Sequence, residues 1–278
     1  MEQSDWLTDG QGLWARVTPG SGEGVLWIHG YTLDSSTWAP LWARLPGWRH
    51  VGVDLPGHGR SRPWAVGESL PALGRALGQM ALANGVRHIV GLSFGGMFAL
   101  QVAIEFPTEF ATLTLAAAGR AGGPQDPYAR LLYRQLGEQY ARRGAGPWMT
   151  ALWMESRPYL FKGAPARPGL WEELQGLVDR YAWAELGNGA LQALNAYEQT
   201  NAEVAAIQSE TLLLTGTQEM RAFQIVAEQL AAIILHSRWL ELPGLNHLCL
   251  LQDPLAGSRH IQAHLEAKNR PNRIESVA

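Results

Sequence analysis

The sequence predicts an α/β fold with a mostly parallel central sheet, flanking helices and an inserted helical cap. Three observations predict it. Short apolar β-type segments alternate with longer helical segments in the first 120 residues, about ninety helical residues follow, and strand segments then resume near residue 211. Because two independent domains would not share one sheet, we interpret the helical residues as an insertion into a single domain.

The first half of the chain supplies five expected strands. They cover residues 13–17, 24–28, 50–54, 88–92 and 112–117. A helix is expected over residues 70–84, and it has an N-cap residue, a first-turn proline and an Asn-Gly stop, at Ser69, Pro71, Asn84 and Gly85. A second helix covers residues 94–106 and is closed by Pro107.

The second half begins with helical segments punctuated by Gly and Pro. They cover residues 127–143, 147–160, 170–186 and 189–206. The chain then returns to the sheet with a strand, a helix and a strand, over residues 211–215, 221–235 and 238–242. These segments predict a core formed by residues 1–120 and 207–268, a helical cap of residues 121–206, and a flexible tail of residues 269–278.

Composition excludes several classes of protein. Of 278 residues 46% are apolar and the net charge is −3, which is typical of a globular domain and not of a disordered chain. Twenty of the 22 basic residues are Arg, but Arg142-Arg143 is the only adjacent pair, so no nucleic-acid partner is expected. The acidic start and the short apolar run at 230–235 argue against a signal peptide and a membrane span. Cys249 is the single cysteine of the chain and cannot form an internal disulfide, so we expect a cytoplasmic protein. The sequence leaves open whether the protein is a monomer or a dimer.

A Gly-x-Ser-x-Gly motif, Gly91-Leu92-Ser93-Phe94-Gly95, lies between a predicted strand and a predicted helix. At such a turn the glycines remove side chains that would clash, and the serine hydroxyl is exposed above the sheet. The helix N-terminus favours negative charge that develops there. The motif thus predicts a nucleophile at Ser93, the alternative being a tight structural turn with an incidental serine.

A serine nucleophile needs a base and an acid that orients the base. His247 lies in the loop after the last predicted strand, at the same edge of the sheet as Ser93. Glu219 is the first acid after the preceding strand. Two alternatives stay open for the acid: Glu219 could serve only as an N-terminal charge of the next helix, and Asp126 could be the acid instead.

These motifs resemble the α/β-hydrolase superfamily over residues 13–265. The matching segments are His29-Gly30, the loop Asp54-Leu55-Pro56-Gly57-His58-Gly59-Arg60-Ser61, the turn around Ser93, and Gly244-Leu245-Asn246-His247 with Asp253-Pro254. The resemblance implies that Ser93 is the nucleophile, that His247 is the general base, and that the backbone N–H groups of Tyr31 and Phe94 form the oxyanion hole. Most members carry Asp at Glu219 and Gly at Asn246, so the chain departs from the pattern twice.

Four further histidines are not expected to be catalytic. His29, His58 and Asp54 lie inside loop motifs of the superfamily and are expected to bond loop backbones. His260 and His264 have helical metal-pair spacing, but no glutamate follows His260 and no third ligand stands out. We therefore expect neither a metal nor another cofactor.

The predicted cap contains aromatic and Met side chains that suit a roomy hydrophobic pocket. The residues expected to face substrate are Trp148, Met149, Trp153 and Met154. The sequence thus predicts a serine hydrolase that cleaves an ester, lactone or thioester of a medium-sized apolar or aromatic small molecule through an acyl-enzyme. Two alternatives remain, because fold and triad do not fix the reaction: C–C bond hydrolysis or a biosynthetic elimination by the same triad, and a ligand receptor on the hydrolase fold.

Overall fold

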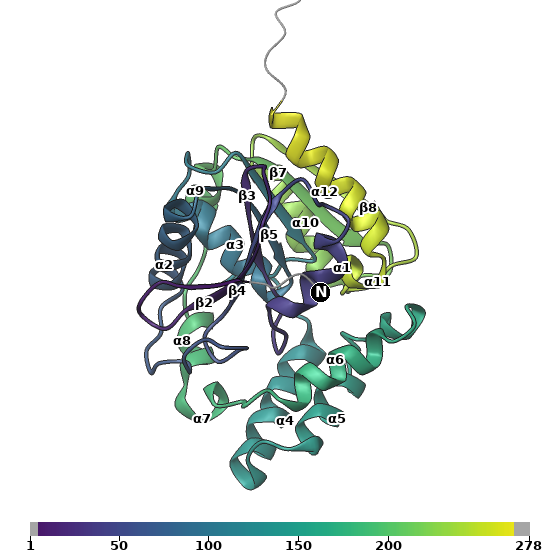
Figure 1. Cartoon of the computed structure of the whole chain (residues 1–278). Coiled ribbons are helices and arrows are strands. Elements are labelled where there is room, and N and C mark those ends of the chain that lie inside the picture. Colours follow the sequence, from purple (N-terminus) through teal and green to yellow (C-terminus); the bar gives the residue numbers. More distant parts are fainter. Residues whose placement is uncertain (1–4, 270–278) are drawn as a thin grey trace, which may run out of the picture.

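The computed structural model describes residues 5–269, which form one sheet with helices on both faces (Figure 1). In this part of the chain the sheet has eight strands in the order β1-β2-β4-β3-β5-β6-β7-β8. The β1–β2 and β2–β4 pairs are antiparallel and the others are parallel, so the predicted α/β class is confirmed. The strands are β1 (Asp5–Thr8), β2 (Trp14–Thr18), β3 (Gly24–Ile28), β4 (Arg49–Asp54), β5 (Val86–Leu92), β6 (Thr112–Ala116), β7 (Glu210–Gly216) and β8 (Ser237–Leu242).

Side chains of the central strands alternate between two hydrophobic cores. In β3, Leu26 and Ile28 belong to one core, and Val25 and Trp27 to the other. The helices of the first core include α2 (Leu70–Ala83), α3 (Phe94–Glu105) and α10 (Arg221–Ile233). The helices of the second include α1 (Ala39–Trp42), α11 (Cys249–Gln252) and α12 (Pro254–Asn269), and helices of the insertion described below add side chains to it. The sheet is therefore buried on both faces, and its strand ends are left to carry functional groups.

The predicted strands lie where expected, and their ends differ from the prediction by at most two residues. The strand that the sequence did not indicate is β1, a four-residue edge strand whose two end residues, Asp5 and Thr8, are exposed. A strand this short with a polar surface carries no run of buried side chains that a pattern could show.

The first helix of the insertion has the bounds that the sequence predicted, and the later ones are shorter than predicted. They are α4 (Pro127–Arg143), α5 (Pro147–Glu155), α6 (Leu170–Asp179), α7 (Glu185–Asn188), α8 (Ala190–Asn195) and α9 (Asn201–Ala205). Helix α5 stops before Arg157-Pro158, because a residue that precedes proline avoids the helical region. The segment predicted over residues 170–186 breaks into α6 and α7 at Trp183, whose φ is 58°.

Helices α4 to α9 lie between β6 and β7 in the chain, and Figure 1 shows α4, α5 and α6 gathered beyond one end of the sheet. The division of the chain at residues 120 and 207 stays a prediction. Of the predicted tail, residue 269 ends α12, and residues 270–278 lie outside the described residues. Within residues 5–269, no helix is both long enough and apolar enough to cross a bilayer.

His50 and His264 are two of the histidines that are buried in the folded chain. Trp27 Nε1 donates to His50 Nδ1 at 3.1 Å, and His50 Nε2 lies 3.0 Å from the Leu45 carbonyl oxygen. Burial lowers the pKa of His50 from 6.5 to about 4. Burial, followed by the positive charge of Arg238, lowers the pKa of His264 to about 4 as well. A proton that binds either ring must therefore bind mainly to the unfolded chain.

We predict that the fold loses stability as the pH falls from 6.5 towards 4. In this window the unfolded chain protonates both imidazoles and the folded chain does not, so the free energy of unfolding falls by up to about 1.4 kcal/mol per pH unit for each histidine. Urea unfolding at several pH values measures the slope. His50→Gln keeps an acceptor and a donor but cannot titrate, and should flatten the slope. His236→Gln, at an exposed position, is the matched control, and an unchanged slope in His50→Gln would contradict the prediction.

Candidate active site

Ser93 stands at a sharp turn between β5 and α3. Its φ of 56° and ψ of −117° lie in a region that non-glycine residues rarely adopt. Its N–H donates to the Ala116 carbonyl at 2.9 Å, and its own carbonyl accepts from the N–H groups of Gly96 and Gly119 at 2.9 and 3.0 Å. These bonds to the neighbouring strand and helix hold the strained residue in place, as is typical of functional sites.

Glycines around the turn allow the backbone segments to touch. A Cβ added at Gly95 would lie 2.2 Å from the Ile28 carbonyl oxygen and 2.3 Å from that of His29. A Cβ at Gly91 would lie 2.6 Å from the Gly95 carbonyl oxygen. The motif glycines are therefore steric requirements for bringing α3 against the end of β3.

His247 joins Ser93 to Glu219. The Ser93 Oγ lies 2.7 Å from His247 Nε2, and His247 Nδ1 lies 3.1 Å from each carboxylate oxygen of Glu219. The side chains of His247 and Glu219 are buried, with 4% and 0% of their surface exposed. A carboxylate at Nδ1 holds the proton on that nitrogen, so Nε2 is free to accept the serine proton.

The loops that carry Glu219 and His247 are bonded directly to each other. The Gln218 N–H donates to the Leu245 carbonyl at 2.9 Å, and Asn246 Nδ2 donates to the Gln218 carbonyl at 3.3 Å. The Asn246 N–H donates to Gln252 Oε1 at 2.8 Å. The asparagine that departs from the superfamily pattern thus links the acid loop to the histidine loop.

The turn after β3 brings the Tyr31 backbone close to Ser93. A Cβ at Gly30 would lie 3.7 Å from Ser93 Cβ, so the turn runs alongside the serine. The N–H groups of Tyr31 and Phe94 bond to no protein acceptor among residues 5–269. Phe94 is the first residue of α3, where such a free N–H is normal. Both donors can therefore serve a ligand above Ser93.

The histidines assigned to loops bond loop backbones. His29 Nε2 accepts from the Leu55 N–H and His58 Nε2 accepts from the Thr32 N–H, both at 3.1 Å. Burial is the main cause that lowers the pKa of each ring, and the charge of His29 lowers that of His58 further. Asp54 accepts from the N–H groups of Ser35 and Arg60 at 2.8 and 2.9 Å. These residues shape the turn that holds Tyr31.

Asp126 and Cys249 lie near the site but do not contact the imidazole. Asp126 Oδ1 caps α4 by accepting from the Tyr128 and Ala129 N–H groups. Burial, and secondarily the charge of Glu219, raises the pKa of the Cys249 thiol to about 12, so the thiol stays protonated. The His260–His264 pair is joined by no third ligand, since residues 5–269 contain no cluster of three metal-ligating side chains.

A cavity of about 500 Å³ opens above Ser93 and His247. Of the four insertion residues expected to face substrate, Trp153 lines it. The expectation is wrong for the other three. Met149 and Met154 are buried in the second core, and Trp148 lies against Arg143 while its Nε1 donates to the Gly144 carbonyl at 3.0 Å. Their helix points the two methionines towards the protein interior.

Helix α4 forms a cavity wall that the sequence reasoning missed. The lining residues follow helical spacing, at Asp126, Ala129, Arg130, Tyr133, Arg134 and Gly137. The helical spacing of these residues is visible in the sequence. However, this helix face mixes charged and small residues, so it differs from the apolar face that marks a buried helix. Further apolar lining comes from Leu160, Phe161, Leu186, Leu191 and Val226.

The sequence pattern of the alpha/beta hydrolase family matches residues 25–257. The chain belongs to this family. This alpha/beta hydrolase is 31% identical over 222 residues to a pimeloyl-[acyl-carrier protein] methyl ester esterase of Stenotrophomonas maltophilia. That match covers 77% of this chain and 82% of the relative. The family resemblance expected from the sequence is therefore confirmed.

Solved structures show the same fold. A thermophilic esterase from Thermogutta terrifontis aligns with a TM-score of 0.76 and 22% identity, covering 96% of this alpha/beta hydrolase and 100% of the esterase chain. An enol-lactonase from Burkholderia xenovorans aligns with a TM-score of 0.76 and 19% identity, covering 94% of this chain and all of the lactonase chain. At these identities the likeness shows the shared fold.

We predict that Gly95→Ala destabilises the protein by about 3 kcal/mol or more, because the added methyl group meets two backbone carbonyls that cannot move independently. Urea unfolding measures the change. The matched control is Gly137→Ala in α4, where a Cβ would meet nothing within 4 Å and the substitution should be neutral or slightly stabilising. Equal midpoints for Gly95→Ala and the wild type would contradict the steric role of Gly95.

Proposed function

We propose that this alpha/beta hydrolase is a carboxylic ester hydrolase that cleaves an ester, lactone or thioester through an acyl-enzyme on Ser93. The observation that carries the proposal is the continuous chain of contacts from Ser93 Oγ to His247, at 2.7 Å, and from His247 to Glu219, at 3.1 Å. Such a chain activates a hydroxyl that is otherwise a poor nucleophile at neutral pH.

The proposed reaction has two halves. His247 Nε2 takes the proton of Ser93 as Oγ attacks the carbonyl carbon, and the N–H groups of Tyr31 and Phe94 stabilise the oxyanion. The intermediate collapses when His247 returns the proton to the departing alkoxide or thiolate, which leaves an ester on Ser93. Water then attacks this ester by the same steps, and the acid is released with Ser93 restored.

The cavity supports an apolar group of medium size. Trp153, Phe161 and Leu160 line it, and a volume of about 500 Å³ lies in the range of small-molecule sites. Two exposed arginines, Arg130 and Arg134, lie on its α4 wall. Arg134 Nε lies as far as 3.9 Å from Glu138 Oε1, and both side chains are exposed. Such an ion pair is weak, so Arg134 can exchange Glu138 for another anion.

These arginines favour a substrate with a negative charge remote from the scissile carbonyl. The curated relative acts, by its name, on a methyl ester attached through its acyl chain to a carrier protein. We infer that the natural substrate has an apolar acyl chain whose far end carries a carboxylate or a larger anionic group. Guanidinium groups are suited to bind either of these.

We predict that Ser93→Ala abolishes both ester turnover and labelling by a fluorophosphonate probe. Glu219→Gln should lower kcat by about 10³–10⁴-fold, because the amide no longer holds the proton on Nδ1. Hydrolysis of p-nitrophenyl esters and mass spectrometry of the labelled protein measure the two effects. The Glu105→Gln variant, on the far end of α3, is the control for loss of a carboxylate. Labelling that survives Ser93→Ala would contradict the assignment. Turnover of esters also separates hydrolysis from a receptor role.

We predict that kcat/KM rises with acyl length up to a medium chain and is higher for an ω-carboxylate than for a matched ω-methyl ester. Replacing both Arg130 and Arg134 by Ala should raise KM for the ω-carboxylate about tenfold, about 1.4 kcal/mol, and leave the ω-methyl ester unchanged. Arg142→Ala, exposed on the same helix, is the control. Preference for short polar esters would contradict the substrate class.

A further inference from the structure

Glu185 is a buried acid that the reaction proposed above does not use. It begins α7 in the insertion and is 1% exposed. The Tyr31 hydroxyl donates to Glu185 Oε1, and the Tyr181 hydroxyl is bonded to the same carboxyl group. Tyr31, in turn, is 6% exposed and lines the cavity above Ser93. A side chain of the insertion is therefore bonded to a core residue that lines the cavity above Ser93.

An acid in this position is costly for the fold. Burial raises the pKa of Glu185, which means that its surroundings disfavour the charged form. Its neighbours are aromatic: Tyr31, Tyr133 and Tyr181 all gain a raised pKa through burial and the charge of Glu185. An apolar side chain of similar size would avoid the desolvation of a carboxyl group. An apolar side chain, however, could not accept the hydrogen bond that the Tyr31 hydroxyl donates to Glu185.

The same backbone turn receives a second bond from the insertion. Trp153 Nε1 donates to Thr32 Oγ1 at 2.9 Å, and Thr32 Oγ1 donates to the Tyr31 carbonyl at 2.6 Å. Thr32 has a φ of 65°, in the left-handed region that a β-branched residue avoids. Contacts on both sides of the Tyr31 peptide groups thus maintain a conformation that the local sequence disfavours.

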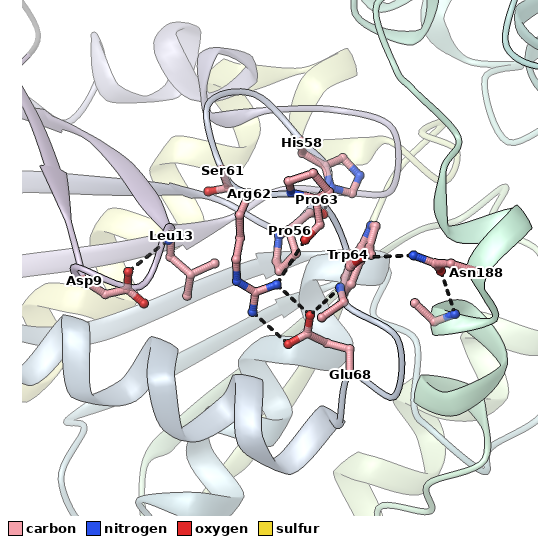
Figure 2. Close-up of polar contacts among 12 residues, drawn as sticks. Asp9, Leu13, Pro56, His58, Ser61, Arg62, Pro63, Trp64, Glu68 and Asn188 are labelled. Carbon is pink, nitrogen blue, oxygen red and sulfur yellow. Dashed lines mark hydrogen bonds and ion pairs between the residues drawn. The ribbon is translucent and has the colours of Figure 1, made fainter.

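Helix α7 is itself fixed to the core at its other end. Asn188 Nδ2 donates to the Trp64 carbonyl at 3.0 Å, and Figure 2 shows Asn188 reaching from its ribbon to the Trp64 loop. On the core side that loop is braced by Arg62 and Glu68, whose two hydrogen bonds measure 2.8 and 2.9 Å. The short helix can therefore hold Glu185 in one place relative to the sheet.

We propose that Glu185 is a positioning residue for the oxyanion hole: by accepting from the Tyr31 hydroxyl, it fixes the direction of the Tyr31 backbone N–H above Ser93. The inference rests on the proposed acyl-enzyme reaction. The side chain and the N–H of Tyr31 leave adjacent atoms, so a ring anchored at its far end restricts rotation of the peptide group. An oxyanion donor is effective over a narrow range of distances, and a displacement of about 1 Å can cost about 100-fold in rate.

The test compares Glu185→Leu, Glu185→Gln and Tyr31→Phe in the full-length protein. Glu185→Leu removes the acceptor and should lower kcat about tenfold or more while KM changes less than about threefold. Glu185→Gln keeps a carbonyl acceptor and should retain most of kcat. Tyr31→Phe should match Glu185→Leu, and the double variant should be no slower than either, because both remove one interaction.

A second readout does not depend on the natural substrate. Attack of Ser93 on a fluorophosphonate also builds negative charge on an oxygen in the oxyanion hole, so the rate of labelling should fall in the same order as kcat. Glu172→Leu, on the exposed surface of α6, controls for loss of an acid from the insertion and should label at the wild-type rate. Thermal unfolding shows whether each variant is folded.

The outcomes separate the two proposals. Wild-type protein that neither turns over esters nor labels at Ser93 would overturn the proposed function. Wild-type protein that labels, with Glu185→Leu and Tyr31→Phe labelling equally fast, would overturn the positioning role of Glu185. A Glu185→Gln variant as slow as Glu185→Leu, or losses that multiply in the double variant, would also overturn it.

Discussion

The first turn of α3 touches the carboxyl end of β3, and the geometry of the whole site follows from that contact. With no side chain at Gly95, the helix start lies against the Ile28 and His29 carbonyls, where a Cβ would be 2.2 and 2.3 Å away. Ser93 has its unusual backbone conformation next to this contact, and the turn at Gly30 lies beside it. Nucleophile and candidate oxyanion donors are thus positioned by one close packing of backbone on backbone.

Much of this arrangement could be predicted from the sequence, because its signals are local. The buried strands are short apolar runs, and the confirmed α/β fold follows from their order along the chain. The Ser93 motif is readable because steric requirements leave glycine as the residue at fixed offsets. Glu219 and His247 follow two neighbouring parallel strands, which bring their loops to one edge of the sheet. There His247 Nδ1 lies 3.1 Å from Glu219 Oε1.

The walls of the cavity could not be predicted in the same way. Met149 and Met154 have the composition of a pocket, yet they fill the second core, since burial of apolar area stabilises either environment. Arg130 and Tyr133 line the cavity on a helix face that shows no apolar stripe. Glu185 gave no signal, because its partner Tyr31 is 154 positions away and nothing near Glu185 in the chain indicates a buried acid.

The insertion leaves the sheet after β6 and returns at β7, its direct neighbour, where Ala116 pairs with Leu214. Helices between these strands can change in length or sequence without altering any strand register. Grafting a relative's insertion onto this core would therefore exchange the pocket while the strand-end loops stayed in place. The bond between Tyr31 and Glu185 crosses that boundary, so a graft leaves the Tyr31 ring anchored only where the incoming helices supply an acceptor at the same point.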